Sequence, residues 1–287
     1  MPRAIRSSPP GPPLRKRLHR QRIGEEGTLL EPRSATRDEV VRCHSGRYYD
    51  LAQKEVAEGA KLLSTGDTNV GDESFSVALL AAGAALLAAT EAIFSKQVSN
   101  AFVASRPPGH HATPSRGMGF CLFNNAAIAA RHAQQKFGVE RVAIFDWDVH
   151  HGNGTQDIFY QDGSVLFCST HQHPWYPGTG MRNESGEGKG KGTTINVPLP
   201  GFYIGYDLIG EAFREAFIKK ALAFKPDFVI ISFTSTPASA IRSATSASPT
   251  RTSPSSPNGS KTSRPAPPTT GCSVLEGGYH IEVASSR

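Results

Sequence analysis

Two adjacent histidines follow a short apolar segment, in the stretch RPPGHH at residues 106–111. The two prolines restrict the backbone of this loop, so we expect both imidazoles to be held rigidly at the end of a strand. Imidazole titrates near neutral pH and is the side chain that enzymes use most often to transfer protons. His110 and His111 are therefore candidate proton-transfer groups.

A second polar cluster follows another apolar segment, in the stretch FDWDVHHGNG at residues 145–154. Residues two apart in an extended chain share a face, so Asp148 and His150 can point at one metal ion while Asp146 and Trp147 face elsewhere. A carboxylate and an imidazole can bind Zn²⁺ or Fe²⁺, and at least one more ligand is needed. One DxH motif is weak evidence, but two histidine-rich strand ends are stronger, because histidines kept for packing rarely cluster.

Two further segments can complete a pocket at these strand ends. The stretch WYPGTG at 175–180 places aromatic residues before a rigid turn, which suits the wall of a narrow apolar channel. The stretch LEGGY at 275–279 places Tyr279 after a strand-like run and a glycine pair, where its phenol can donate to a developing oxyanion. Each segment taken alone would favour a packing role.

The elements that must position these residues alternate along the chain. Apolar runs of strand length end in polar or glycine-rich turns, and helical patterns lie between them. This alternation predicts an α/β fold with a mostly parallel central sheet, covered on both faces, and a site at the carboxyl ends of the strands. The expected strands are Ala101–Ala104, Val142–Phe145, Val165–Cys168, Thr194–Val197, Phe228–Ile231 and Cys272–Leu275, and the expected helices are Tyr49–Leu63, Ser76–Phe94, Asn124–Phe137 and Tyr206–Phe224.

The composition excludes several classes of protein. With 287 residues, 38% of them hydrophobic, the chain is long and apolar enough for a large folded domain. The net charge of +6 lies in two low-complexity zones, so it gives little support to a nucleic-acid-binding face. No apolar run reaches membrane length. The 4 cysteines stand far apart without a CxxC pair, which argues against a disulfide scaffold or zinc ribbon and favours a reducing compartment.

Three zones of composition divide the chain. Residues 1–22 form a basic leader rich in proline and arginine, for which we expect disorder; it reads as a targeting peptide, an anion-binding arm or an inert leader. Residues 23–287 read as one folded domain, interrupted at 233–270. That interruption consists almost entirely of Ser, Thr, Pro and Ala and contains no Asp or Glu. A long structureless loop between two strand-like runs is unusual inside a compact domain.

The motifs together resemble those of the zinc-dependent histone deacetylase family, which includes the acetylpolyamine amidohydrolases. They are RPPGHHA (106–112), MGFCLFNN (118–125), DWDVHHGNGT (146–155), STHQ followed by YPGTG (169–180) and LEGGY (275–279). Asn153 and the glutamate of LEGGY are similar to the class II-like or bacterial-type branch. The resemblance implies an arginase-like three-layer fold. It also implies that this fold is incomplete around 233–270 and at the N-terminus, where the family's HPERP-like stretch is absent.

The resemblance also implies roles for individual residues. Asp148 and His150 would bind zinc, and His111 would be the general base. His110 would be supported by Asp146. The remaining roles fall to Asn153 beside His111, to Gly119, Phe120 and Tyr176 as walls of the acyl-lysine channel, to Tyr279 as the group that polarises the carbonyl, and to Asp146, Asp148, His150, Ser169 and Thr170 around a structural K⁺.

The implied activity is zinc-dependent hydrolysis of acetyl-lysine amides in histones or other proteins, releasing acetate, with a role in chromatin regulation. The partner would be an acetylated lysine peptide or protein, or an acetylated small amine, with no direct nucleic-acid or membrane partner. We expect a cytoplasmic or nuclear location, or an organelle if the leader is a targeting signal. One alternative is a catalytically dead protein that binds acyl-lysine or a partner, and another is an acetylpolyamine amidohydrolase.

One departure from the family bears directly on activity. The family's third zinc ligand is an aspartate in a GFD-like motif after the strand that ends here at Ser232, but this chain continues Phe233-Thr234-Ser235. Codons permitted for residues 234–254 can be read, from the third base of the Thr234 codon, as FDSRxxDPLGxLxLTDEDFA. This string restores the aspartate, so we expect the segment at about 233–270 to be an out-of-frame reading.

Overall fold

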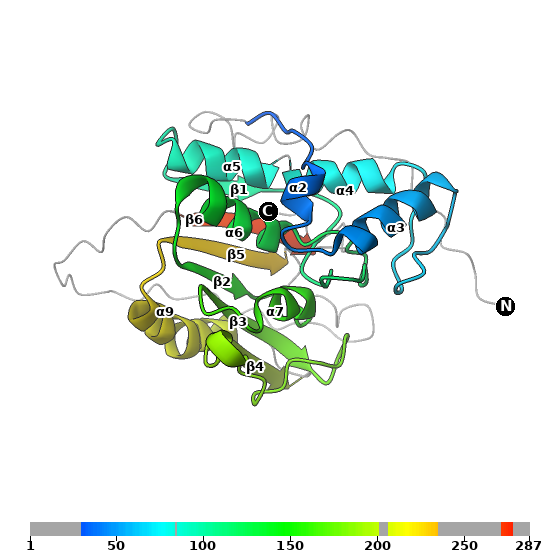
Figure 1. The fold of residues 1–287 in the computed structure, drawn as a ribbon. Coiled ribbons are helices and arrows are strands. Elements are labelled where there is room, and N and C mark those ends of the chain that lie inside the picture. Colours follow the sequence, from blue (N-terminus) through cyan, green and yellow to red (C-terminus); the bar gives the residue numbers. More distant parts are fainter. Residues whose placement is uncertain (1–29, 84, 201–205, 235–270, 278–287) are drawn as a thin grey trace, which may run out of the picture. The chain divides into compact units, whose positions relative to one another are not determined.

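The sheet that the sequence predicts is present in the computed structural model, which describes residues 30–83, 85–200, 206–234 and 271–277 (Figure 1). Its six strands are all parallel and follow the order β1-β6-β5-β2-β3-β4. The order places β6, the last of the strands in the described ranges, between β1 and β5. The strands are β1 (Asn100–Val103), β2 (Val142–Asp146), β3 (Val165–His173), β4 (Thr194–Pro200), β5 (Phe228–Thr234) and β6 (Gly271–Gly277).

Helices precede and connect these strands, as parallel pairing requires. A π-helical turn, Phe213–Ile218, joins the last two helices. None of the helices in the described ranges is long and apolar enough to cross a membrane. The helices are α2 (Arg37–Val40), α3 (Gly46–Ala57), α4 (Ser74–Gly83), α5 (Ala85–Phe94), α6 (Asn125–Phe137), α7 (Asn153–Phe159), α8 (Tyr206–Ala212) and α9 (Lys219–Phe224), with a short 3₁₀ turn at Gly188–Gly190.

Both faces of the sheet are covered, because alternate residues of each strand point to opposite sides. On β2, Ala143 and Phe145 pack against Phe217 and Ala221 of the segment that ends in α9. Every residue of β2 is buried, including Asp146 at its carboxyl end. Helices α4, α5 and α6 contact one another, and α5 and α6 also contact strands of the sheet. The polar end of β2 is therefore enclosed by core rather than exposed on a surface.

Helix α6 shows how the sequence fixes the elements near the site. Asn124 caps its amino end by accepting a hydrogen bond from the backbone N–H of Ala127 at 3.0 Å. Gly138 ends the helix in the left-handed conformation, at φ +68°. A run of buried alanines lets this helix lie close to the sheet. Its amino end comes directly after the GFCLFNN stretch, so the cap also fixes one wall of the pocket described below.

The predicted strands and fold class are confirmed, with small differences at the strand ends. The helix expected over Tyr49–Leu63 ends instead at Ala57, because Gly59 takes φ +79° and leaves the helical path. Helix α7 was not expected, since its Gly-Asn-Gly start is typical of a loop. All four cysteines are free and buried. The predictions for residues 1–22 and for 235–270 lie outside the described residues.

Candidate active site

A cavity of about 190 Å³ opens at the carboxyl ends of the central strands. It combines imidazoles, carboxylates and aromatic rings from the loop between α3 and α4, from the loops that follow β1, β2 and β3, and from β6 itself. The lining residues are Asp67, Pro108, His110, His111, Gly119, Phe120, Asp148, His150, Tyr176 and Glu276. Most residues singled out from the sequence therefore meet in one place, as expected for functional groups at the ends of parallel strands.

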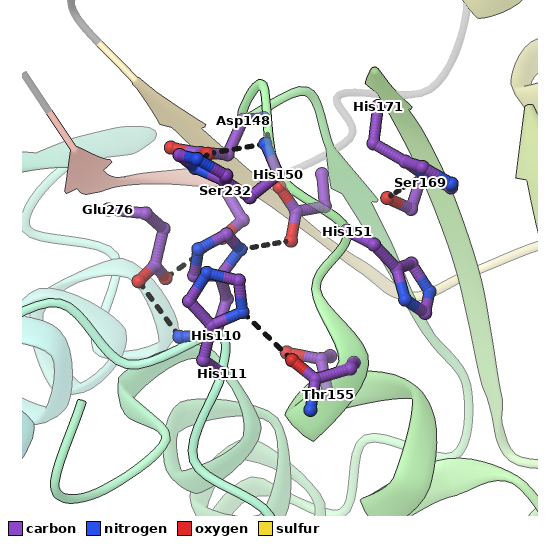
Figure 2. A network of polar contacts seen from close by, with 12 residues as sticks. His110, His111, Asp148, His150, His151, Thr155, Ser169, His171, Ser232 and Glu276 are labelled. Carbon is purple, nitrogen blue, oxygen red and sulfur yellow. Dashed lines mark hydrogen bonds and ion pairs between the residues drawn. The ribbon is translucent and has the colours of Figure 1, made fainter. Parts of the chain in front are cut away.

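His110 is paired with the carboxylate at the end of β2 (Figure 2). Its Nδ1 lies 3.0 Å from Asp146 Oδ2, and both side chains are almost fully buried. Burial opposes the charged imidazole, but the nearby carboxylates of Asp146 and Asp148 outweigh it and raise the pKa of His110 to about 10. His110 is therefore an imidazolium at neutral pH, and it is paired with Asp146 as the family resemblance implies.

His111 has the opposite character. Its Nδ1 lies 2.8 Å from Asn153 Oδ1, an amide oxygen that can only accept, so Nδ1 carries the proton. Burial, together with the positive charge of His110, holds the pKa of His111 well below its usual range. The ring is therefore neutral, and its Nε2 lone pair is available to accept a proton. This tautomer is the one that a general base requires.

Asp148 and His150 contact each other at the cavity, in a bend at residues 148–150 that follows β2. Asp148 Oδ1 lies 3.0 Å from His150 Nδ1 and also accepts the backbone N–H of His150 at 2.8 Å. Burial would raise the pKa of Asp148, but the charges of His110 and His150 lower it to about 2. The cavity is thus lined by an ionised carboxylate and by the imidazole that it contacts.

This donor set does not complete a zinc site. A catalytic zinc needs three protein ligands, and no group of three His, Cys, Asp or Glu side chains among the described residues is placed to hold a metal ion. Within β5, Ser232 Oγ donates to Glu276 Oε1 at 2.8 Å. Asp148 and His150 are the candidate ligands in the described ranges, and no third side chain joins them there.

The channel wall consists of the predicted residues and one that the sequence did not reveal. Tyr176 packs edge-on against His111, with ring centroids 5.0 Å apart. Its hydroxyl donates to Asp67 Oδ1 at 3.3 Å, and the same oxygen accepts the backbone N–H of Gly119 at 2.8 Å. Phe120 is 55% exposed beside them. Asp67 therefore ties together the loops that carry Gly119 and Tyr176.

The loop that carries Tyr176 is fastened by a polar network behind the cavity. Thr179 Oγ1 lies 2.8 Å from His151 Nδ1, and His171 Nε2 donates to the carbonyl of Gly180 at 3.0 Å. A Cβ on Gly180 would lie 2.5 Å from the His171 ring, so only glycine fits between the two histidines. The sequence analysis did not single out His151, His171 or Gly180 for this role.

No observation on the described residues supports the predicted potassium site. Ser169 Oγ lies 3.0 Å from His171 Nδ1, and the buried Thr170 hydroxyl has no hydrogen-bond partner in the described structure. These groups could face a cation, but no further observation identifies one, and the potassium ion stays a prediction. Tyr279 lies outside the described residues, so its predicted position is not described either.

Gly119 supports His111 by contact, and this leads to a prediction. A Cβ at Gly119 would lie 2.3 Å from His111 Cδ2, and the residue has φ +58°. Gly59 also has a positive φ, +79°, but nothing lies within 4 Å of its position for a Cβ. We expect Gly119→Ala to lower the free energy of unfolding by about 1–3 kcal/mol more than Gly59→Ala, measured by urea denaturation. Equal losses would show that Gly119 does not press on His111.

The class of protein is defined by the sheet and by the groups at its strand ends. The crystal structure of the HDA15 HD domain is similar to this chain, with a TM-score of 0.76 and 33% sequence identity. The similarity covers 93% of this chain and 77% of that chain. The protein therefore has the arginase-like α/β fold of the deacetylases.

The chain belongs to the histone deacetylase family, since residues 12–287 match the histone deacetylase domain. A probable deacetylase of Archaeoglobus fulgidus is 44% identical over 236 residues, which cover 78% of this chain and 64% of the relative. The chloroplastic histone deacetylase 14 of Arabidopsis thaliana is 40% identical over 213 residues, covering 71% of this chain and 50% of the relative. The chain thus spans about half to two thirds of the length of these curated relatives.

Proposed function

We propose that this protein is an amidohydrolase of the deacetylase type, whose substrate is an acetylated lysine in a histone or another protein. The neutral His111 carries the proposal, because its Nε2 accepts a proton beside the Asp148 and His150 pair. We further propose Zn²⁺ as the cofactor of a complete site, with Asp148 and His150 as two of its ligands. The polypeptide with the present sequence after Ser232 lacks the third ligand, and we propose that it is inactive.

The described residues support three parts of amide hydrolysis. Tyr176, Gly119 and Phe120 enclose a narrow channel that suits the aliphatic stem of acetyl-lysine. His111 Nε2 takes the proton from the attacking water, with Asn153 holding its tautomer. His110, as an imidazolium bound to Asp146, supplies fixed positive charge beside the reacting carbonyl. The amine leaves protonated, and the products are acetate and the free amine.

Two alternatives remain open for testing. The channel and the histidine pair are in place although the third ligand is missing, which favours a protein that binds acyl-lysine without turnover. An acetylated small amine, such as an acetylpolyamine, contains the same acetyl amide and alkyl chain and would fit the same channel. Binding of an acetyl-lysine peptide and an acetylpolyamine, compared by calorimetry, distinguishes the two ligand classes.

Zinc content tests the proposal for the present polypeptide. Because only two ligands converge in the described site, we expect zinc to be lost on dialysis against EDTA and acetyl-lysine peptides to remain intact. Metal analysis of the purified full chain measures this, with His150→Ala as a control that should hold no less zinc after dialysis. Stoichiometric, chelator-resistant zinc together with rapid deacetylation would show that another residue supplies the third ligand.

A further inference from the structure

A buried carboxylate on β6 lies directly beneath the loop of paired histidines. Glu276 is 2% exposed, and its Oε2 accepts the backbone N–H groups of Gly109 at 2.6 Å and His110 at 3.0 Å. Its other oxygen accepts the Ser232 hydroxyl from β5 at 2.8 Å. Figure 2 shows this carboxylate pointing at the backbone of the histidine loop. One side chain thus joins β6, β5 and the loop.

The loop depends on this side chain for its hydrogen bonds. Gly109 and His110 come after the end of β1, so their N–H groups have no partner on a neighbouring strand. A buried N–H group left without an acceptor is costly, and a buried carboxylate is costly without donors. Burial raises the pKa of Glu276, while hydrogen bonds from Gly109 and Ser232 favour its ionised form. The N–H groups of the loop therefore supply the donors that the buried carboxylate needs, and the carboxylate supplies the acceptor that these N–H groups need.

The opposite side of the loop is equally constrained. A Cβ at Gly109 would lie 2.4 Å from the backbone nitrogen of Asn125, at the start of α6. The Asn125 side chain donates to the carbonyl of Pro107 at 3.1 Å. The loop is held between α6 and Glu276, so the backbone of His110 has little room to move. A change at Glu276 would be transmitted directly to the two imidazoles.

We infer that Glu276 is a positioning residue for the histidine pair. It fixes the backbone of Gly109 and His110 against β6, and so sets the distance of His111 from Asp148 and His150. Only the assignment of His111 as the general base rests on the proposed function. The inference that Glu276 holds the backbone of Gly109 and His110 does not depend on it.

A role for Glu276 as a substitute metal ligand is less well supported by the geometry. Both of its oxygens already accept hydrogen bonds from the protein. It also lines the cavity with Asp148 and His150, yet these three do not form a group that could hold a metal ion in the described site. Its hydrogen bonds are those of a residue that holds the histidine loop in place.

Hydrogen exchange of the Gly109 and His110 amides in the full chain tests the inference, followed by NMR. We expect Glu276→Ala to accelerate exchange at both amides by about 10- to 100-fold, as for loss of a hydrogen bond to a charged group. Glu276→Gln, whose amide oxygen can still accept both N–H groups, should retain most of the protection. Asp67→Ala is the matched control, because it removes the acceptor of the Gly119 amide and should leave Gly109 and His110 unchanged.

Two results would overturn the inference. One is unchanged exchange of both amides in Glu276→Ala. The other is an equal loss of protection in Glu276→Gln, which would assign the effect to charge instead of hydrogen bonding. If Glu276→Ala does not fold, Glu276→Asp replaces it, since its shorter side chain withdraws the acceptor and should release the same two amides. None of these measurements requires catalysis, so chelator-resistant zinc and rapid deacetylation by a chain with protected Gly109 and His110 amides would contradict the proposed inactivity alone.

Discussion

A protein in which the alternative frame replaces residues 234–270 is expected to hydrolyse acetyl-lysine peptides, and His111→Ala is expected to lower its kcat by about 10²–10⁴-fold. The reason is the hydrogen bond that fixes the His111 tautomer, which leaves Nε2 as a proton acceptor in the cavity that Asp148 and His150 also line. Release of acetate or of a fluorophore from an acetyl-lysine peptide measures the rate. Hydroxamates, which chelate zinc, should inhibit this protein.

Tyr279 provides the second half of the same test. If its phenol stabilises the oxyanion, Tyr279→Phe should lower kcat by about 10²–10³-fold. Tyr160→Phe is a matched control, because Tyr160 stands at the end of α7 and does not line the catalytic cavity. Unchanged turnover in both His111→Ala and Tyr279→Phe would remove these two residues from the mechanism.

Sequencing of the gene and its transcript is expected to reveal a missing or extra base near the Phe233 and Thr234 codons. A compensating change, or a misplaced intron boundary, is expected near Gly271. The structure locates the two expected changes. β5 ends at Thr234 and β6 begins at Gly271, and these two strands pair with each other, so the chain fits the fold on both sides of the interval 235–270. The intervening 36 residues contain no carboxylate, although the resemblance to the family implies one directly after this strand.

Mass spectrometry of the natural protein provides a check at the level of the polypeptide. Peptides from Ser243–Lys261 should be absent, and peptides that contain the string DPLG should be present. Reads on both strands that confirm the present frame, together with peptides from Ser243–Lys261, would contradict the prediction. The protein would then be a member of the family that has lost its third ligand.

The sheet could be predicted from sequence because its strands are short buried runs of Val, Ile and Phe bounded by polar turns. The spacing argument for Asp148 and His150 assumed an extended chain, whereas strand β2 ends at Asp146 and residues 148–150 form a bend in which the two side chains contact each other. The pairing of His110 with Asp146 and of His111 with Asn153 was obtained from the family resemblance, and the geometry agrees with it.

The residues that the sequence did not reveal act through contacts between distant segments. Glu276 binds an amide 167 positions earlier in the chain, and Asp67 binds a phenol 109 positions later. No local pattern of hydrophobicity or turn residues indicates such pairs. His151 and His171 were missed for the same reason, since their role follows from the position of Gly180 between them.

The insertion of β6 between β1 and β5 has a consequence for how the protein is made. A ribosome releases β1, β5 and the histidine loop well before it releases Glu276, so these segments emerge without the strand that joins them. Their exposed strand edges must be kept from pairing with other chains until β6 has been synthesised. Closure of the sheet and assembly of the catalytic loop are then the same late event in folding. A nascent chain stalled before β6 would carry both histidines and yet have no active site.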